Sequence, residues 1–374
     1  MTTYAGRWIT TYGPMELHQD GSAIRGTYWF QGIACAIEGK VQNGRFTFRY
    51  KDPSGAGQGW FESPSYGQIR GQYFLDGTKH WADWTGHREW DGIWDTSFGR
   101  VRLVQEEGRI HGCYESVGPA RIEGRLDGKR FVFRYFEPKV QGDGWFELTA
   151  DGSAFDGSWR PDGATAWGAW QGQRVFARPG LTWLVVIEAH WQRSLADGEY
   201  SYGMMLKEFF ARLPHIAVRH RFFNDESSME RWCRELTYVP EPAIVLISSH
   251  GLSEGVTVNG QTIDTKRVVN SLQHAGNIKL LHFAACLMLK EETAGDFARR
   301  LGQEVPYPIS GYTTSIDWGG SAVLEFGYLD MILGKGMPPQ EAARLLPTLI
   351  KFAADKAPAE SPYAAVGFRF FNGR

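Results

Sequence analysis

The stretch "AIVLISSHGLSEG" (residues 243–255) is an apolar run that ends abruptly at a histidine followed by a glycine. A second apolar run, "IKLLHFAACLMLK" (residues 278–290), carries Cys286 at the corresponding place. Nearly uniform apolar runs of this kind are typical of central parallel strands that are covered on both faces. We therefore predict two strands of an α/β sheet at residues 243–249 and 278–285, with His250 at the carboxyl end of the first and Cys286 at the carboxyl end of the second.

The sequence around these runs has the same character. From residue 181 onward, β-like segments alternate with segments that have apolar residues at helical spacing. Besides the two runs above, four strands are predicted at residues 183–189, 216–223, 307–313 and 364–371. One helix is predicted to open with a capping box of Ser227 and Glu230. The alternation predicts an α/β domain over residues 181–374, with a six-stranded, mostly parallel sheet flanked by helices.

The N-terminal half differs from the C-terminal half in its composition and in its sequence pattern. Of the 15 tryptophans, 11 lie in the first 180 residues, and "IEGKVQNGRFTFRY" (residues 37–50) returns 85 positions later as "IEGRLDGKRFVFRY". Such a fixed period indicates duplication of one structural unit. Phenylalanines alternate with polar residues in both copies, and turn signals are frequent, so we predict a tandem repeat of antiparallel, up-and-down, barrel-like sheets at residues 1–90 and 91–176. The sequence leaves open whether the repeats form one barrel or two.

The opening segment "GRWITTYGPMELHQDGSAIRGTY" (residues 6–28) resembles the first strands of avidin- and lipocalin-type barrels. This resemblance implies a module that binds a regulatory ligand or protein. A simpler interpretation is that the aromatic side chains fill the interiors of small barrels, which require bulky residues there.

Composition narrows the classes of partner. The formal net charge is −2 and no long block of Lys and Arg is present, so neither nucleic acid nor a membrane is expected as a partner. The first residues lack the pattern of a signal peptide. The four cysteines are scattered without a CxxC pair, which argues against a zinc site and for a reducing, cytoplasmic setting. We expect no metal and no cofactor.

Three motifs together resemble those of the caspase-like cysteine peptidases, a group that includes caspases, metacaspases, separase, clostripain and the bacterial CHAT domains. The motifs are "VLISSHG" (residues 245–251), "LLHFAAC" (residues 280–286) and "ISGYTTSIDWGGSA" (residues 309–322). The last is most similar to bacterial CHAT-type members. The resemblance covers roughly residues 181–374.

The resemblance implies a cysteine endopeptidase that acts on a protein or peptide substrate. Cys286 would be the nucleophile and His250 the general base. A free thiol has a pKa near 8.5, so an imidazole is needed to generate the thiolate. The backbone N–H groups of Gly251 and Cys286 would form the oxyanion hole.

The sequence departs from the caspase pattern, which has glutamine two residues before the cysteine and Arg-Gly after it. Here Ala284 and Leu287-Met288 occupy those places, so a preference for aspartate before the scissile bond is not implied. Asp317 would contribute a pocket wall that pairs with an arginine or lysine of the substrate, or would stabilise a loop or helix start. Trp318 is a second candidate for the pocket wall, or packs in the core.

Several alternatives remain open. His190 ends the first predicted strand and is a second candidate base, whereas His282 lies about 13 Å from Cys286 along one extended strand, too far for proton transfer. The remaining cysteines are interpreted as packing residues: Cys35, Cys113 and Cys233. An alternative function is a catalytically inactive caspase-like adaptor fused to a ligand-binding barrel. A third is a small-molecule carrier with a purely structural C-terminal half.

Overall fold

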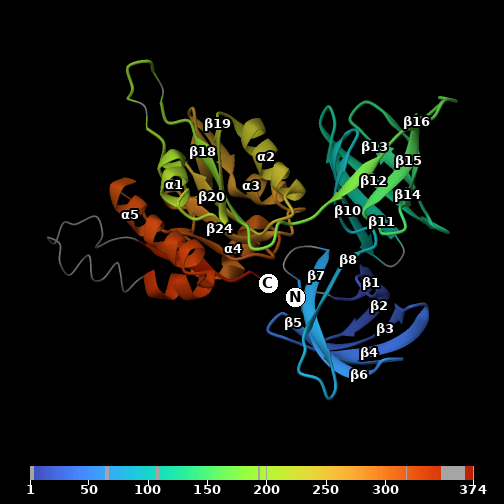
Figure 1. Cartoon of the computed structure of the whole chain (residues 1–374). Coiled ribbons are helices and arrows are strands. Elements are labelled where there is room, and N and C mark those ends of the chain that lie inside the picture. Colours follow the sequence, from blue (N-terminus) through green and yellow to red (C-terminus); the bar gives the residue numbers. More distant parts are fainter. Residues whose placement is uncertain are drawn as a thin grey trace. The chain divides into compact units, whose positions relative to one another are not determined.

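A computed structural model describes residues 4–63, 67–106, 109–192, 194–198, 200–316, 318–346 and 367–373 of the chain. The chain divides into two compact units, Met1–Ala177 and Arg178–Arg374. The first consists of antiparallel strands, and the second combines a sheet with helices (Figure 1).

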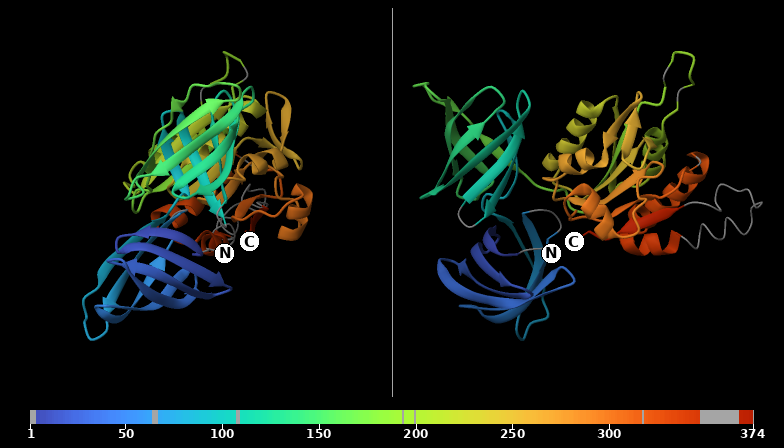
Figure 2. Two further views of the ribbon diagram at one scale, coloured as in Figure 1. Left: turned by 90° about the vertical axis from the view of Figure 1, so that its right-hand side faces the viewer. Right: turned by 180° about the vertical axis from the view of Figure 1, so that it is seen from behind.

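The first repeat folds into a closed antiparallel barrel (Figure 2). Each strand pairs with the next, and β1 also pairs with β8 to complete the ring. In β5, Phe46, Phe48 and Tyr50 are buried and the residues between them are exposed, as the period-two alternation predicts. The strands are β1 (Gly6–Thr10), β2 (Gly13–Asp20), β3 (Ala23–Phe30), β4 (Ile33–Gln42), β5 (Arg45–Asp52), β6 (Gly55–Glu62), β7 (Gln68–Leu75) and β8 (Ala82–Arg88).

The second repeat forms a barrel of its own. Its ring closes because β17 pairs with both β9 and β15, while the two-residue strand β16 pairs with β15 alone. The prediction of a tandem antiparallel barrel-like repeat is therefore confirmed, and the copies form two barrels rather than one larger sheet. The strands are β9 (Gly92–Thr96), β10 (Gly99–Glu106), β11 (Arg109–Glu115), β12 (Pro119–Asp127), β13 (Arg130–Phe136), β14 (Gln141–Leu148), β15 (Ala154–Pro161), β16 (Gly168–Ala169) and β17 (Gly172–Val175).

Equivalent aromatic residues fill the two barrel interiors. Trp84 is buried in the first barrel and Trp170 in the second. Each indole N–H donates a hydrogen bond of 3.0 Å to a threonine hydroxyl, that of Thr10 in the first case and of Thr96 in the second. Packing thus accounts for the aromatic residues of the interior.

The second unit contains a six-stranded sheet in the order β19-β18-β20-β24-β25-β26. The first five strands are parallel, and β26 is antiparallel to β25. Their bounds are β18 (Thr182–Ala189), β19 (Ile216–Phe223), β20 (Ala243–Ser248), β24 (Ile278–Ala284), β25 (Ile309–Tyr312) and β26 (Phe368–Phe371). The two runs with which the sequence analysis began are therefore adjacent parallel strands in the middle of the sheet.

Helices cover both faces of this sheet (Figure 1). On one face α1 (Tyr202–Phe210) and α5 (Trp318–Leu329) share an apolar core with the strands. On the other, the core includes α2 (Glu226–Glu235), α3 (Thr265–Ser271) and α4 (Ala294–Leu301). A 3₁₀ turn (Leu236–Tyr238) follows α2, and a π-helical turn (Asp330–Gly334) follows α5.

Three details of this unit differ from the sequence-based expectation. A small sheet of β21 (His250–Gly251), β22 (Gly255–Val258) and β23 (Gln261–Asp264) follows β20 and was not predicted. Helix α2 is capped by Asp225 and Ser228, not by Ser227 and Glu230, because the helix begins at Glu226, two residues earlier than a cap at Ser227 implies. The predicted strand at 364–371 is shorter, and its residues 364–366 lie outside the described residues.

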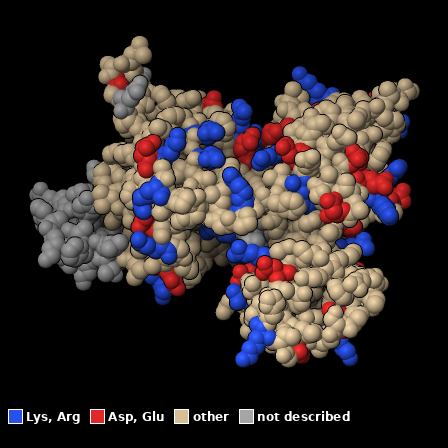
Figure 3. Space-filling view, in the orientation of Figure 1, with Lys and Arg blue, Asp and Glu red and all other residues tan. Residues whose placement is uncertain are grey.

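Acidic and basic side chains are interspersed on the face shown in Figure 3, in keeping with the formal net charge of −2. Within the described residues, no helix combines the length and the apolar character needed to cross a bilayer.

Candidate functional site

The site lies at the carboxyl ends of β20 and β24. In the register of these two parallel strands, Ser248 is opposite Ala284. His250 and Cys286 each follow two residues later, so both leave the same edge of the sheet from neighbouring strands. This is the relation on which the sequence-based hypothesis depends, since parallel strands present their carboxyl ends together.

His250 and Cys286 line one small pocket of about 120 Å³. The histidine is exposed and the cysteine is half-buried. The Cys286 Sγ accepts a hydrogen bond of 3.3 Å from the backbone N–H of Ile316, which also lines the pocket. Among the described residues, no hydrogen bond joins the imidazole to the thiol. Catalytic hydrogen bonds are often open in proteins without bound substrate, so the shared pocket is the relevant observation.

Gly251 brings the backbone of the histidine segment against that of Cys286. A Cβ at position 251 would lie 2.2 Å from the Cys286 carbonyl oxygen and 2.8 Å from its backbone nitrogen. Both distances are too short for non-bonded atoms, so only glycine fits here. The two backbone N–H groups that the sequence analysis assigned to an oxyanion hole therefore belong to segments in direct contact.

The backbone directly after Cys286 has an unfavourable conformation. Leu287 has a φ of 64°, in the left-handed region that a bulky residue normally avoids. Its N–H donates to the carbonyl of Thr314, which holds the turn against the segment that follows β25. Such outliers cost about 1–3 kcal/mol and cluster at active sites and ligand clamps.

Of the two residues that were predicted to form a substrate pocket, only Trp318 is among the described residues. Trp318, at the start of α5, lines the Cys286 pocket and is 45% exposed. Its ring lies 6.1 Å from that of Tyr200 and 6.5 Å from that of Tyr202. Asp317 lies outside the described residues.

Sequence reasoning did not identify Glu188, a fully buried carboxylate at the end of β18. Its oxygens accept hydrogen bonds from Trp191 Nε1 (2.6 Å), Ser201 Oγ (2.6 Å) and the Tyr202 N–H (2.7 Å). His220 Nε2 lies 2.7 Å away. Burial alone would raise the pKa of Glu188, but the donors from His220, Ser201 and Trp191 outweigh it and lower the pKa.

Trp191 connects this carboxylate to the candidate base. The edge of one ring faces the other, with the Trp191 and His250 centroids 5.0 Å apart, and Trp191 lines the Cys286 pocket. Glu188 therefore positions a wall of the pocket on the side of His250. His190, the alternative base, lines a different pocket and contacts the carbonyl of Gln192.

A second buried carboxylate, Glu325 of α5, lines the Cys286 pocket itself. It accepts a hydrogen bond of 2.9 Å from the Tyr312 hydroxyl and lies 3.3 Å from His282 Nε2. His282 is fully buried, and its Nδ1 contacts Ser310 Oγ at 2.8 Å. The burial of Tyr312, together with the negative charge of Glu325, raises its pKa far above the usual range, so the hydroxyl remains a donor.

Both carboxylates left a signal in the sequence. Glu188 interrupts the apolar strand "WLVVIEA", and Glu325 interrupts the apolar helix "GSAVLEFGYL". A single acid within an apolar element is rarely buried without partners and often indicates a specific polar site. Among the described residues, no group of three or more His, Cys, Asp and Glu side chains is arranged to hold a metal ion.

We expect Glu188→Gln to lower the free energy of unfolding of the second unit by about 2 kcal/mol, because an amide NH₂ replaces an oxygen that accepts hydrogen bonds in a buried site. Denaturant titration of the full chain, followed by circular dichroism, measures the change. Glu208→Gln, at an exposed position of α1, is the matched control and should change stability by less than about 0.5 kcal/mol. Equal effects of the two substitutions would contradict the anchoring role of Glu188.

No known family model matches the chain, and no curated protein matches it. Among solved structures, the chain is similar to secretory abundant heat soluble protein 4 from Ramazzottius varieornatus, with 12% identity over 32% of this chain and 72% of that chain and a TM-score of 0.13. It is also similar to a double mutant of transferrin binding protein B from Haemophilus parasuis Hp5, with 13% identity over 45% of this chain and 44% of that chain and a TM-score of 0.17. A third similar structure is that of Burkholderia oklahomensis agglutinin, with 11% identity over 43% of this chain and 82% of that chain and a TM-score of 0.12. At these TM-scores the likenesses carry no argument about this chain.

Proposed function

We propose that the chain is a cysteine endopeptidase of the caspase-like, bacterial CHAT type, with His250 and Cys286 as its catalytic dyad. The observation that supports this most directly is the register of β20 and β24, which brings these two residues into one pocket. The strained turn at Leu287 and the close approach of Gly251 to Cys286 add independent support.

The reaction begins when His250 takes the thiol proton and the Cys286 sulfur attacks the carbonyl carbon of the scissile peptide bond. The N–H groups of Gly251 and Cys286 stabilise the negative oxygen that forms. The C–N bond then breaks, His250 returns the proton to the leaving amine, and a thioester remains on Cys286. Water, deprotonated by His250, hydrolyses the thioester and restores the thiol.

The pocket wall determines which side chain precedes the cleaved bond. Trp318 supplies an aromatic surface, and Glu325 supplies a buried carboxylate within the pocket. A carboxylate is the natural partner of an arginine or lysine side chain, the role that the sequence analysis gave to Asp317. We therefore propose a protein or peptide substrate with a basic residue at this position.

The N-terminal barrels have a regulatory role in this proposal. Their interiors are filled with aromatic side chains, so a regulatory ligand or protein would bind to their ends or outer surfaces. No disulfide joins any of the four cysteines, all of which lie within the described residues; this fits a reducing compartment, and we propose a cytoplasmic location.

The proposal is tested by incubating the purified full-length chain with a diverse peptide library and sequencing the products. We expect cleavage after a narrow set of residues, and loss of cleavage in proportion to the alkylation of Cys286 by iodoacetamide, mapped by mass spectrometry. An intact library, or cleavage that survives complete alkylation of Cys286, would favour the inactive adaptor.

A further inference from the structure

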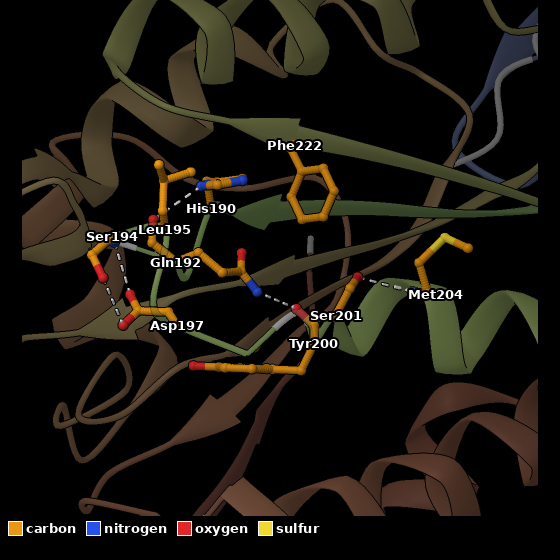
Figure 4. A pocket seen from close by; sticks show the side chains of 9 residues that line it. All are labelled: His190, Gln192, Ser194, Leu195, Asp197, Tyr200, Ser201, Met204 and Phe222. Carbon is orange, nitrogen blue, oxygen red and sulfur yellow. Dashed lines mark hydrogen bonds between the residues drawn. The ribbon is translucent and has the colours of Figure 1, made fainter.

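A larger cavity lies between the loop after β18, the start of α1 and the end of β19 (Figure 4). Its volume is about 910 Å³. Its lining includes Leu195, Tyr200, Met204 and Phe222. No step of the proposed reaction uses this cavity.

Four large apolar side chains of the lining are exposed. Leu195 is fully exposed, and the exposed fractions of Tyr200, Met204 and Phe222 are 50%, 44% and 37%. Apolar side chains that gather in a concave surface are more informative than the same residues scattered singly, because a cavity removes them from water only when it is occupied.

Several polar groups in the described part of the loop form hydrogen bonds with one another. The Gln192 side-chain amide donates to the Tyr200 carbonyl at 2.9 Å, and the Ser194 N–H donates to the Asp197 carboxylate at 2.9 Å (Figure 4). The far end of the loop is held by the bond from Ser201 Oγ to Glu188. These bonds connect the described parts of the loop, and the lining of the cavity also includes the exposed apolar side chains named above.

Residues that line the cavity lie next to residues that line the Cys286 pocket. Ser201 lines the cavity, and the next residue, Tyr202, lines the Cys286 pocket. The Tyr200 ring lies 6.1 Å from Trp318 and 6.3 Å from Trp191, both of which line the Cys286 pocket. A row of aromatic rings thus leads from one space to the other.

We propose that this cavity is a second substrate subsite, which binds an apolar or aromatic side chain of the polypeptide a few residues from the scissile bond. This inference rests on the proposed peptidase function. A chain whose carbonyl lies at Cys286 must extend beyond the 120 Å³ pocket, and an extended peptide advances about 3.3 Å per residue. The neighbouring aromatic wall and cavity lie within reach of the residues that flank the bond.

The test compares two adjacent methionines of α1. Met204→Glu introduces a charge into the cavity, whereas Met205→Glu changes a residue that is also partly exposed, at 37%, but does not line it. A charge in place of an apolar side chain weakens the binding of an apolar group in the cavity. We therefore expect Met204→Glu to lower kcat/KM about 10- to 100-fold for peptides with an apolar flanking residue. Glycine at that flanking position should abolish the difference between the variant and the wild type.

The controls separate this inference from the function on which it rests. Met205→Glu should cleave like the wild type, and both variants should react with iodoacetamide at Cys286 at the wild-type rate. If the wild type cleaves peptides without preference at any flanking position and Met204→Glu cleaves equally well, the subsite is disproved and the peptidase stands. If the wild type cleaves no peptide, the proposed peptidase function is itself disproved, and the subsite is disproved with it. If Met204→Glu instead separates a dimer in sedimentation experiments, the cavity binds a second copy of the chain, and the inference is overturned.

Discussion

Cys286→Ala lowers kcat for peptide cleavage by at least about 10⁴-fold, because no other atom of the site can form the thioester; losses of this size follow removal of a catalytic nucleophile in comparable enzymes. The other cysteines cannot replace it. Cys35 and Cys233 are buried, and burial raises the pKa of the Cys233 thiol to about 12. Cleavage of a peptide selected from the library, with the products quantified by chromatography, measures the loss.

Cys113→Ala is the matched control, since Cys113 is a partly exposed cysteine of the second barrel. It should leave cleavage unchanged. His250→Ala should resemble Cys286→Ala in turnover but retain a thiol that iodoacetamide alkylates, because the nucleophile is present and only the base is lost. Activity of Cys286→Ala above background, or wild-type turnover by His250→Ala, would argue against the dyad.

Gly251→Ala should lower kcat about 10²- to 10³-fold, the effect of losing one oxyanion donor. The added Cβ would lie 2.2 Å from the Cys286 carbonyl oxygen and 2.8 Å from its nitrogen, so the two backbones must separate. The thiol is not altered chemically, and KM should change far less than kcat. Steady-state kinetics on the same peptide distinguish the two parameters.

Gly327→Ala provides the comparison for this substitution. Gly327 lies in α5, where an added Cβ meets nothing within 4 Å, and alanine is favourable in a helix. This variant should cleave at the wild-type rate. If Gly251→Ala were equally active, the contact between the two segments would have no catalytic role, and the oxyanion hole would have to be sought elsewhere in the pocket.

The strands of the second unit were readable because their composition reflects burial. β20 and β24 are apolar throughout, and both were located to within a residue or two. The sequence does not determine which strands are neighbours, because that depends on crossovers over many residues. The predicted proximity of His250 and Cys286 therefore depended on the assumption that their strands are neighbours. In the structure β20 and β24 are adjacent.

Some features were missed although a local signal was present. Asn259-Gly260 between two short runs is a strong hairpin signal, and both residues have positive φ values, 49° and 77°, in the turn between β22 and β23. The role of Glu188 could not be predicted from the sequence in the same way. Its partner His220 is on another strand, and only the tertiary structure brings the two together.

The barrels of the first unit are closed sheets, whereas the sheet of the second unit has two edge strands, and this difference affects how a partner protein can bind. Each barrel's ring of paired strands is complete, apart from the two-residue β16, whereas the other sheet, as far as its residues are described, ends in the edge strands β19 and β26. An incoming polypeptide adds as an extra strand only where backbone N–H and C=O groups are unpaired. A partner that binds a barrel must therefore be recognised through side chains and loops rather than through strand pairing. Surface substitutions can change the specificity of such binding without altering the paired strands.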